Sequence, residues 1–118
     1  MSKDNKNTEN KITMDKTFQL SFYDYATPFY GSFRGMRYRL ARTPLEKVYG
    51  KSQEVKEAGK LEAIVWPGPM AFDYTKEEDK IKKEFPYTKE GKEEAIQWLN
   101  EQYEERKEQY TEVYHYIR

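Results

Sequence analysis

Aromatic side chains, rather than aliphatic ones, must build whatever core this chain forms. It carries eleven tyrosines, six phenylalanines and two tryptophans, which together make up 16% of its 118 residues. Charged residues account for 36% of the chain, a level at which disorder would be expected, but disordered segments are poor in aromatic residues. We therefore expect one small folded domain with polar ends, whose core is formed by amphipathic rings.

Missing residue types exclude several kinds of chemistry. The chain has no cysteine and one histidine, His115. Disulfides, thiolate metal sites and a cysteine nucleophile are excluded, and a single histidine argues against a Ser-His-Asp triad or a multi-histidine metal site. No apolar run approaches the roughly 20 residues of a membrane span, and residues 1–16 lack the apolar segment of a signal peptide. We expect a cytoplasmic protein that is not an enzyme, needs no metal or cofactor, and does not enter a membrane.

Alternating apolar and polar residues predict three β-strands, at 17–25, 36–42 and 60–66. Residues 1–16 are almost wholly polar and cannot bury enough surface to offset the entropy of ordering them. We expect a flexible tail there, followed by a single domain over 17–118.

The segments between these strands carry weaker signals. Residues 26–35 contain one proline and two glycines and are predicted to be a connecting loop. A short helix is predicted near 45–49 and an exposed loop over 51–59. The charged stretch 75–84 fits either a short helix or a solvated loop.

A long helix is predicted over 89–115. Thr88 is suited to cap its first turn, while Gly91 weakens that turn. One helix packed across an antiparallel sheet of about three strands gives a small α+β domain. The helix carries one apolar stripe with steps of three and four residues, formed by Ile96, Leu99, Tyr103, Tyr110, Val113 and Ile117.

Charge is unevenly distributed along the chain. Residues 1–60 hold 12 basic and 7 acidic side chains, and residues 61–118 hold 9 basic and 14 acidic ones, so charges of +5 and −5 cancel. The acidic half includes the helix, whose polar face can imitate a phosphate backbone and contact a basic partner. The alternative is an ordinary solvated helix face. The residues we expect to make such contacts are Glu94, Glu101, Glu105 and Glu108.

The basic half holds four arginines within nine residues. A basic strand with aromatic residues nearby suits single-stranded nucleic acid, because guanidinium groups bind phosphates and rings stack on bases. The alternative is that these arginines pair with the acidic helix of the same protein, since nucleic-acid-binding domains usually carry net positive charge. The cluster is Arg34, Arg37, Arg39 and Arg42.

Three aromatic residues are further candidates for partner contacts: Tyr30, Trp66 and Trp98. Trp66 begins a rigid corner, Trp-Pro-Gly-Pro-Met, and is equally well explained as a core residue that closes the last strand. Trp98 lies beside the apolar stripe of the helix, where it either widens the buried face or is exposed. A homodimer is a third hypothesis, with contacts through Tyr110, Val113, Tyr114 and Ile117 at the helix end.

Four segments together resemble a family of small uncharacterised proteins carried on conjugative and phage-derived elements of Gram-positive bacteria. They are GMRYRLAR (35–42), AIVWPGP (63–69), KEFPYTKEG (83–91) and AIQWLN (95–100), and the resemblance spans about residues 33–104. It implies an accessory protein of a mobile element, a setting in which small proteins often inhibit host defence, CRISPR effectors included. The resemblance assigns no role to a single residue.

The leading hypothesis is therefore a non-enzymatic inhibitor that occludes a host defence nuclease with its acidic surface. The second is a small module that binds single-stranded nucleic acid through the arginine-rich strand. The third is a structural homodimer.

Overall fold

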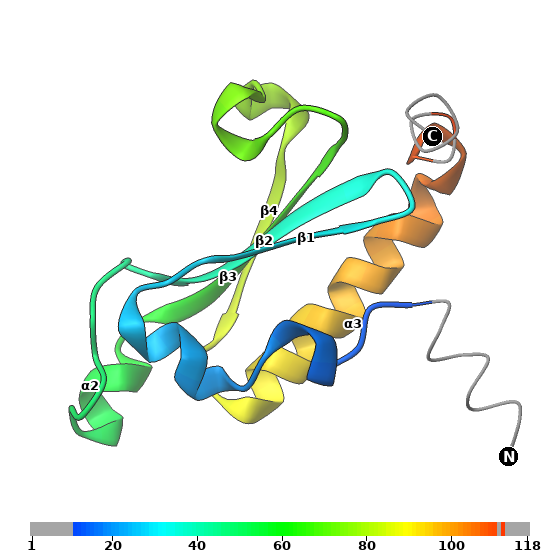
Figure 1. Cartoon of the computed structure of the whole chain (residues 1–118). Coiled ribbons are helices and arrows are strands. Elements are labelled where there is room, and N and C mark those ends of the chain that lie inside the picture. Colours follow the sequence, from blue (N-terminus) through cyan, green and yellow to red (C-terminus); the bar gives the residue numbers. More distant parts are fainter. Residues whose placement is uncertain (1–10, 111, 113–118) are drawn as a thin grey trace, which may run out of the picture.

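The structure is a small α+β domain in which one long helix packs on a four-stranded antiparallel sheet (Figure 1). This computed structural model describes residues 11–110 and residue 112. Neighbouring strands in the sheet are also neighbours along the chain. The predicted fold class is confirmed, with four strands in place of about three. The main elements are β1 (Phe29–Phe33), β2 (Met36–Thr43), α2 (Gln53–Glu57), β3 (Lys60–Pro67), β4 (Ile81–Pro86) and α3 (Lys89–Glu105).

Strands β2 and β3 form where alternation predicted them, and their register divides the sheet into two faces. Leu40 lies opposite Ala63, and both side chains are buried beneath α3. Arg37 lies opposite Trp66 on the other side of the sheet. We call this second side the open face; it carries Tyr30, Ser32, Arg37, Arg39 and Trp66.

The predicted strand at 17–25 is wrong. This segment forms two short 3-10 helices, Asp15–Thr17 and Leu20–Tyr25, separated by Phe18, whose φ of 66° lies outside the range of a β-strand. The edge strand is instead β1, inside the predicted loop 26–35. Gly31 makes β1 compatible with its neighbour, because a Cβ there would lie 2.5 Å from the ring of Tyr38.

Two further elements lie where loops were expected. The short helix is at 53–57 rather than 45–49, and the Ser52 hydroxyl accepts a hydrogen bond from the Val55 N–H (3.3 Å) at its start. Strand β4 takes in part of the charged stretch 75–84. Its exposed lysines suit an edge strand, where charge discourages pairing with another chain.

The helix α3 begins as predicted and ends earlier. The Thr88 hydroxyl accepts a hydrogen bond from the Gly91 N–H (2.9 Å). The helix α3 ends at Glu105 because Arg106 has non-helical backbone angles, and residues 107–110 are helical again, as predicted. Tyr110 then stacks on Tyr103, with ring centroids 6.1 Å apart. The remainder of the predicted helix, from residue 113, lies outside the described residues.

The part of the predicted tail that the structure describes is packed against α3. The side chain of Asn100 bonds both backbone groups of Ile12, at 2.9 and 3.0 Å, and Ile12 is buried. The ammonium of Lys92 donates to the Thr17 hydroxyl (2.7 Å) and the Met14 carbonyl (3.1 Å). The prediction of a flexible tail over 1–16 is therefore corrected for residues 11–16.

A buried polar cluster joins the N-terminal segment to the end of β4. The Tyr87 hydroxyl donates to one carboxylate oxygen of Asp24 (2.7 Å), and the Lys56 ammonium lies 3.0 Å from the other. Burial, and then the bond to Asp24, raise the pKa of Tyr87 above its ordinary value. Burial likewise raises the pKa of Tyr23. Both phenols must be neutral in the folded protein.

Stability should therefore fall at alkaline pH. Below a pH of about 10 the phenols are neutral in both states, but above it those of the unfolded chain ionise first, so the free energy of unfolding decreases as pH rises. Tyr87→Phe should cost about 1 kcal/mol at neutral pH, because the bond to Asp24 is lost, and should make the alkaline decrease shallower. Urea denaturation across this pH range measures both effects. The exposed residue Tyr74 gives the control, Tyr74→Phe. If the free energy of unfolding fell as steeply at alkaline pH in Tyr87→Phe as in this control, the buried Tyr87 phenol would not be a cause of the decrease.

Gly91→Ala should destabilise the protein even though alanine favours helix by about 1 kcal/mol. A Cβ at Gly91 would lie only 1.9 Å from the carbonyl oxygen of Pro86, so α3 would have to move away from β4. We expect a net loss of about 1–3 kcal/mol in urea denaturation. Glu94→Ala, at an exposed position of the same helix, is the control and should be nearly neutral. If Gly91→Ala were more stable than the unaltered protein, the close contact between α3 and the Pro86 carbonyl would not be needed for the fold.

Candidate functional site

The connection between β3 and β4, residues 68–80, folds back over the open face of the sheet (Figure 1). Its Phe72 ring lies 5.4 Å from the ring of Trp66 on β3 and 6.0 Å from that of Tyr30 on β1. The indole N–H of Trp66 donates to the carbonyl of Met70 (2.8 Å). Phe72 therefore contacts rings on β1 and β3, the strands on either side of β2.

Two cations flank the Phe72 ring. The Lys80 ammonium lies 3.7 Å from the ring centroid, and the Arg39 guanidinium carbon lies 5.0 Å from it. Arg39 also donates to the Tyr30 hydroxyl (3.2 Å) and lies 3.6 Å from the carboxylate of Glu62. Cations held over aromatic faces fix the loop on the sheet.

Glu77 fastens the other end of the loop. Its carboxylate lies 2.6 Å from the ammonium of Lys82 on β4 and 3.0 Å from that of Lys80. Hydrogen bonds from Lys82, and then from Lys80, lower the pKa of Glu77 below its ordinary value. The carboxylate is therefore charged at neutral pH and keeps both lysines turned toward the loop.

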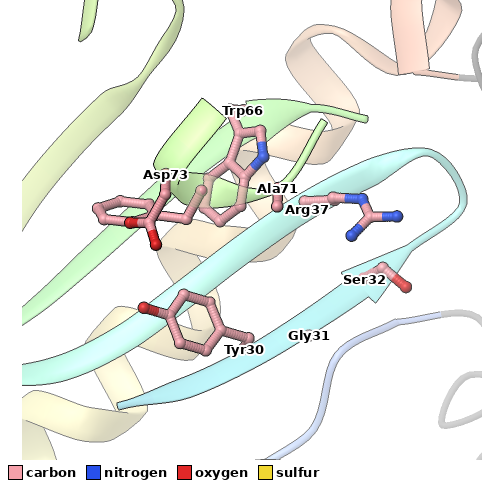
Figure 2. A pocket seen from close by; sticks show the side chains of 8 residues that line it. Tyr30, Gly31, Ser32, Arg37, Trp66, Ala71 and Asp73 are labelled. Carbon is pink, nitrogen blue, oxygen red and sulfur yellow. The ribbon is translucent and has the colours of Figure 1, made fainter. Parts of the chain in front are cut away.

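A pocket of about 410 Å³ lies between this loop and the strands β1 and β2. Figure 2 shows Arg37 and Ser32 at one end, the Asp73 carboxylate and the Tyr30 hydroxyl at the other, and Trp66 and Ala71 between them. The volume suits a small ring-bearing ligand. The lining is completed by Gly31 and Phe72.

Two charged groups of the pocket have no partner among the described residues. Arg37 is half-buried and makes no hydrogen bond or ion pair with any of them. Asp73 is exposed and is likewise unpaired within that part of the chain. A half-buried guanidinium without an anion is costly to desolvate, so this pocket is suited to a ligand that carries negative charge.

The structure does not gather the four predicted arginines on one surface. Arg37 and Arg39 share the open face, and Arg34 lies in the turn between β1 and β2, 5.4 Å from the ring of Phe33. Arg42 is 2% exposed and donates to the carbonyls of Pro44, Val55 and Lys56 at 2.9–3.2 Å. Arg42 therefore stabilises the connection between β2 and β3, which corrects its assignment to the nucleic-acid-binding cluster.

The alternative that the arginines pair with the acidic helix is also corrected for the two on the open face. Arg39 pairs with Glu62 of β3, and Arg37 has no ion pair among the described residues. Both project from the side of the sheet opposite α3.

Of the three predicted aromatic contacts, only Tyr30 is exposed. Its side chain is 52% exposed, whereas Trp66 is 2% and Trp98 is 8% exposed. Trp98 packs edge-on against Phe85, with centroids 6.0 Å apart. Both tryptophans are therefore core residues, which corrects their assignment as contacts.

The predicted acidic contacts are all exposed. Glu94, Glu101 and Glu105 lie along α3, and Glu108 follows the break at Arg106. Glu105 lies 3.5 Å from the guanidinium of Arg106, and Glu101 accepts a hydrogen bond from Gln97 (3.2 Å). Three of the four carboxylates therefore lie on α3, seven and four residues apart, so they share one face of the helix.

The predicted dimer contacts lie largely beyond the described residues, since these do not include Val113, Tyr114 and Ile117. Tyr110 is 1% exposed, so its ring is not available to a second chain. Over residues 11–110, no helix combines the length and the hydropathy needed to cross a membrane. That same part of the chain contains no group of three or more acidic or histidine side chains placed to hold a metal ion.

Sequence reasoning did not place Phe72, Asp73 and Ser32 in a binding pocket. The rigid corner after Trp66 signalled a chain reversal, but nothing in the pattern showed that the following residues return to the sheet. Ser32 was assigned to a loop because its strand was not recognised.

The fold and pocket define a small α+β domain with an aromatic, arginine-bearing site on its sheet. Comparison of the chain with known protein families, with curated proteins and with solved structures gives no match.

Proposed function

We propose that this chain is a binding protein that takes single-stranded nucleic acid on the open face of its sheet. The observation that carries this proposal is the unpaired guanidinium of Arg37 in a pocket walled by Tyr30 and Phe72. A guanidinium binds a phosphate through two parallel hydrogen bonds, and an exposed ring stacks on a base. Phosphates and bases occur together in nucleic acid, which accounts for both features of the pocket.

The geometry favours a single strand over a duplex. In a duplex the faces of the bases are stacked on one another, so Tyr30 could reach a base only if it were unpaired. The ring is 52% exposed at the mouth of the pocket.

The molecule has no net charge, so affinity should be modest and should depend on a few contacts. Arg39 contributes mainly by holding Tyr30 and Phe72 in place, because its guanidinium already contacts both rings and Glu62. Arg37 is then the principal phosphate contact.

Binding of a labelled oligothymidine of about eight nucleotides, measured by fluorescence anisotropy, tests the proposal. We expect binding to weaken between about 50 and 200 mM salt, and a duplex of equal length to bind more weakly. Arg37→Gln should reduce the magnitude of the logarithmic salt slope by about 0.7, the contribution of one phosphate on a single strand. Tyr30→Ala should cost about 1–3 kcal/mol of binding free energy.

Lys107→Gln is the matched control, because it removes one positive charge from the exposed surface beyond α3 and leaves the open face intact. It should bind as the unaltered protein does. Absence of salt-dependent binding, or equal affinities for Arg37→Gln and the control, would refute the proposal.

A second candidate is occlusion of a basic partner by the acidic surface, which includes inhibition of a host defence nuclease. It is favoured by one observation: every glutamate of α3 is exposed. Exposed carboxylates at a spacing of one or two helical turns can bind the positive channel that normally holds phosphates. The kinship with mobile-element proteins and the cytoplasmic location remain predictions.

Replacing Glu94, Glu101, Glu105 and Glu108 together by glutamine tests this candidate. A nuclease-resistant protein partner captured by the unaltered chain should be lost by this variant at low salt and retained by Arg37→Gln. Retention by the glutamine variant would show that the acidic surface does not make the contact.

A further inference from the structure

The two ends of the open-face pocket have opposite charges, which restricts the orientation of a ligand. Asp73 provides a carboxylate at the end where the Tyr30 hydroxyl lies, and Arg37 a guanidinium at the other (Figure 2). A ligand that fits both ends must present hydrogen-bond donors to Asp73 and an anion to Arg37. The rings of Tyr30 and Phe72, which also line the pocket, favour a planar ligand.

Asp73 is held in place by its own turn. The Tyr74 N–H donates to the carbonyl of Ala71 (3.1 Å), and the Thr75 hydroxyl donates to the same carbonyl (2.8 Å). The preceding residue, Phe72, is fixed between Lys80 and Arg39. The backbone at Asp73 is therefore fixed by this turn, while its carboxylate is exposed and has no partner among the described residues.

We infer that this pocket selects guanine within a single strand, with the base edge at Asp73 and a phosphate at Arg37. This inference rests on the proposed function. An ionised carboxylate only accepts hydrogen bonds, and it accepts them through two oxygens. The base that binds it best is the one with two adjacent donors on its pairing edge.

Guanine alone among the four bases has that arrangement. Its ring N1–H and exocyclic N2–H₂ point in the same direction, so both can donate to one carboxylate. Adenine and cytosine place a ring acceptor beside their single amino group, and that acceptor repels a carboxylate. Thymine and uracil place carbonyl oxygens on both sides of their one donor.

Four oligothymidines of about eight nucleotides, identical except for a central thymidine, guanosine, cytidine or adenosine, test the inference by fluorescence anisotropy. The guanosine strand should bind at least about fivefold more tightly than the others, the lower end of what one bidentate base contact supplies. Asp73→Asn should remove the preference for guanosine while retaining binding to the all-thymidine strand. An amide loses one acceptor and presents a donor toward the donors of guanine.

Asp79→Asn is the matched control, since Asp79 is an exposed aspartate of the same loop that does not line the pocket. It should keep the full preference for guanosine. Equal binding of all four strands by the unaltered protein would overturn the inference and leave the proposed function standing. A preference that persists in Asp73→Asn would overturn it too. Failure of all four strands to bind would refute the proposed function itself.

Discussion

Packing of Phe72 against Trp66 and Tyr30 is the interaction on which the two-sided organisation of this domain depends. A single helix, α3, covers one face of the sheet, and the chain has no second long helix among the described residues for the other. The β3–β4 loop covers part of that second face instead, through one ring flanked by Arg39 and Lys80. Because this cover is partial, it leaves a pocket beside it and keeps Tyr30 exposed. The candidate site is therefore a consequence of the partial cover that this loop gives to the second face of the sheet.

Local patterns were sufficient to predict the central strands and the start of the helix. Alternation located β2 and β3, and the Thr88 cap located α3, because these signals depend only on neighbouring residues. Alternation at 17–25 was misleading because this segment forms two short 3-10 helices rather than a strand. Tyr23 is buried there, and its hydroxyl donates to the carbonyl of Thr17 (2.6 Å). The edge strands β1 and β4 were missed because glycine in one and charge in the other conceal the pattern.

The candidate site could be predicted only in part. The side chains of Arg37 and Tyr30 were identified from residue type, but the sequence did not show that they share one pocket. That depends on the register, which sets Ser32 opposite Arg37, and on a loop that returns Phe72 and Asp73 from more than thirty residues away. Arg42 shows the converse: the same residue type three positions beyond Arg39 is buried, where it donates to backbone carbonyls.

We propose that nucleic acid binds on the open face of the sheet and not on α3. Titration of isotope-labelled protein with oligothymidine, followed by two-dimensional NMR of the backbone amides, tests it most directly. We expect the largest chemical-shift changes at residues 30–39 and 70–73, and unchanged amide signals from α3. Shifts concentrated along α3, or no shifts at all at saturating oligonucleotide, would contradict it.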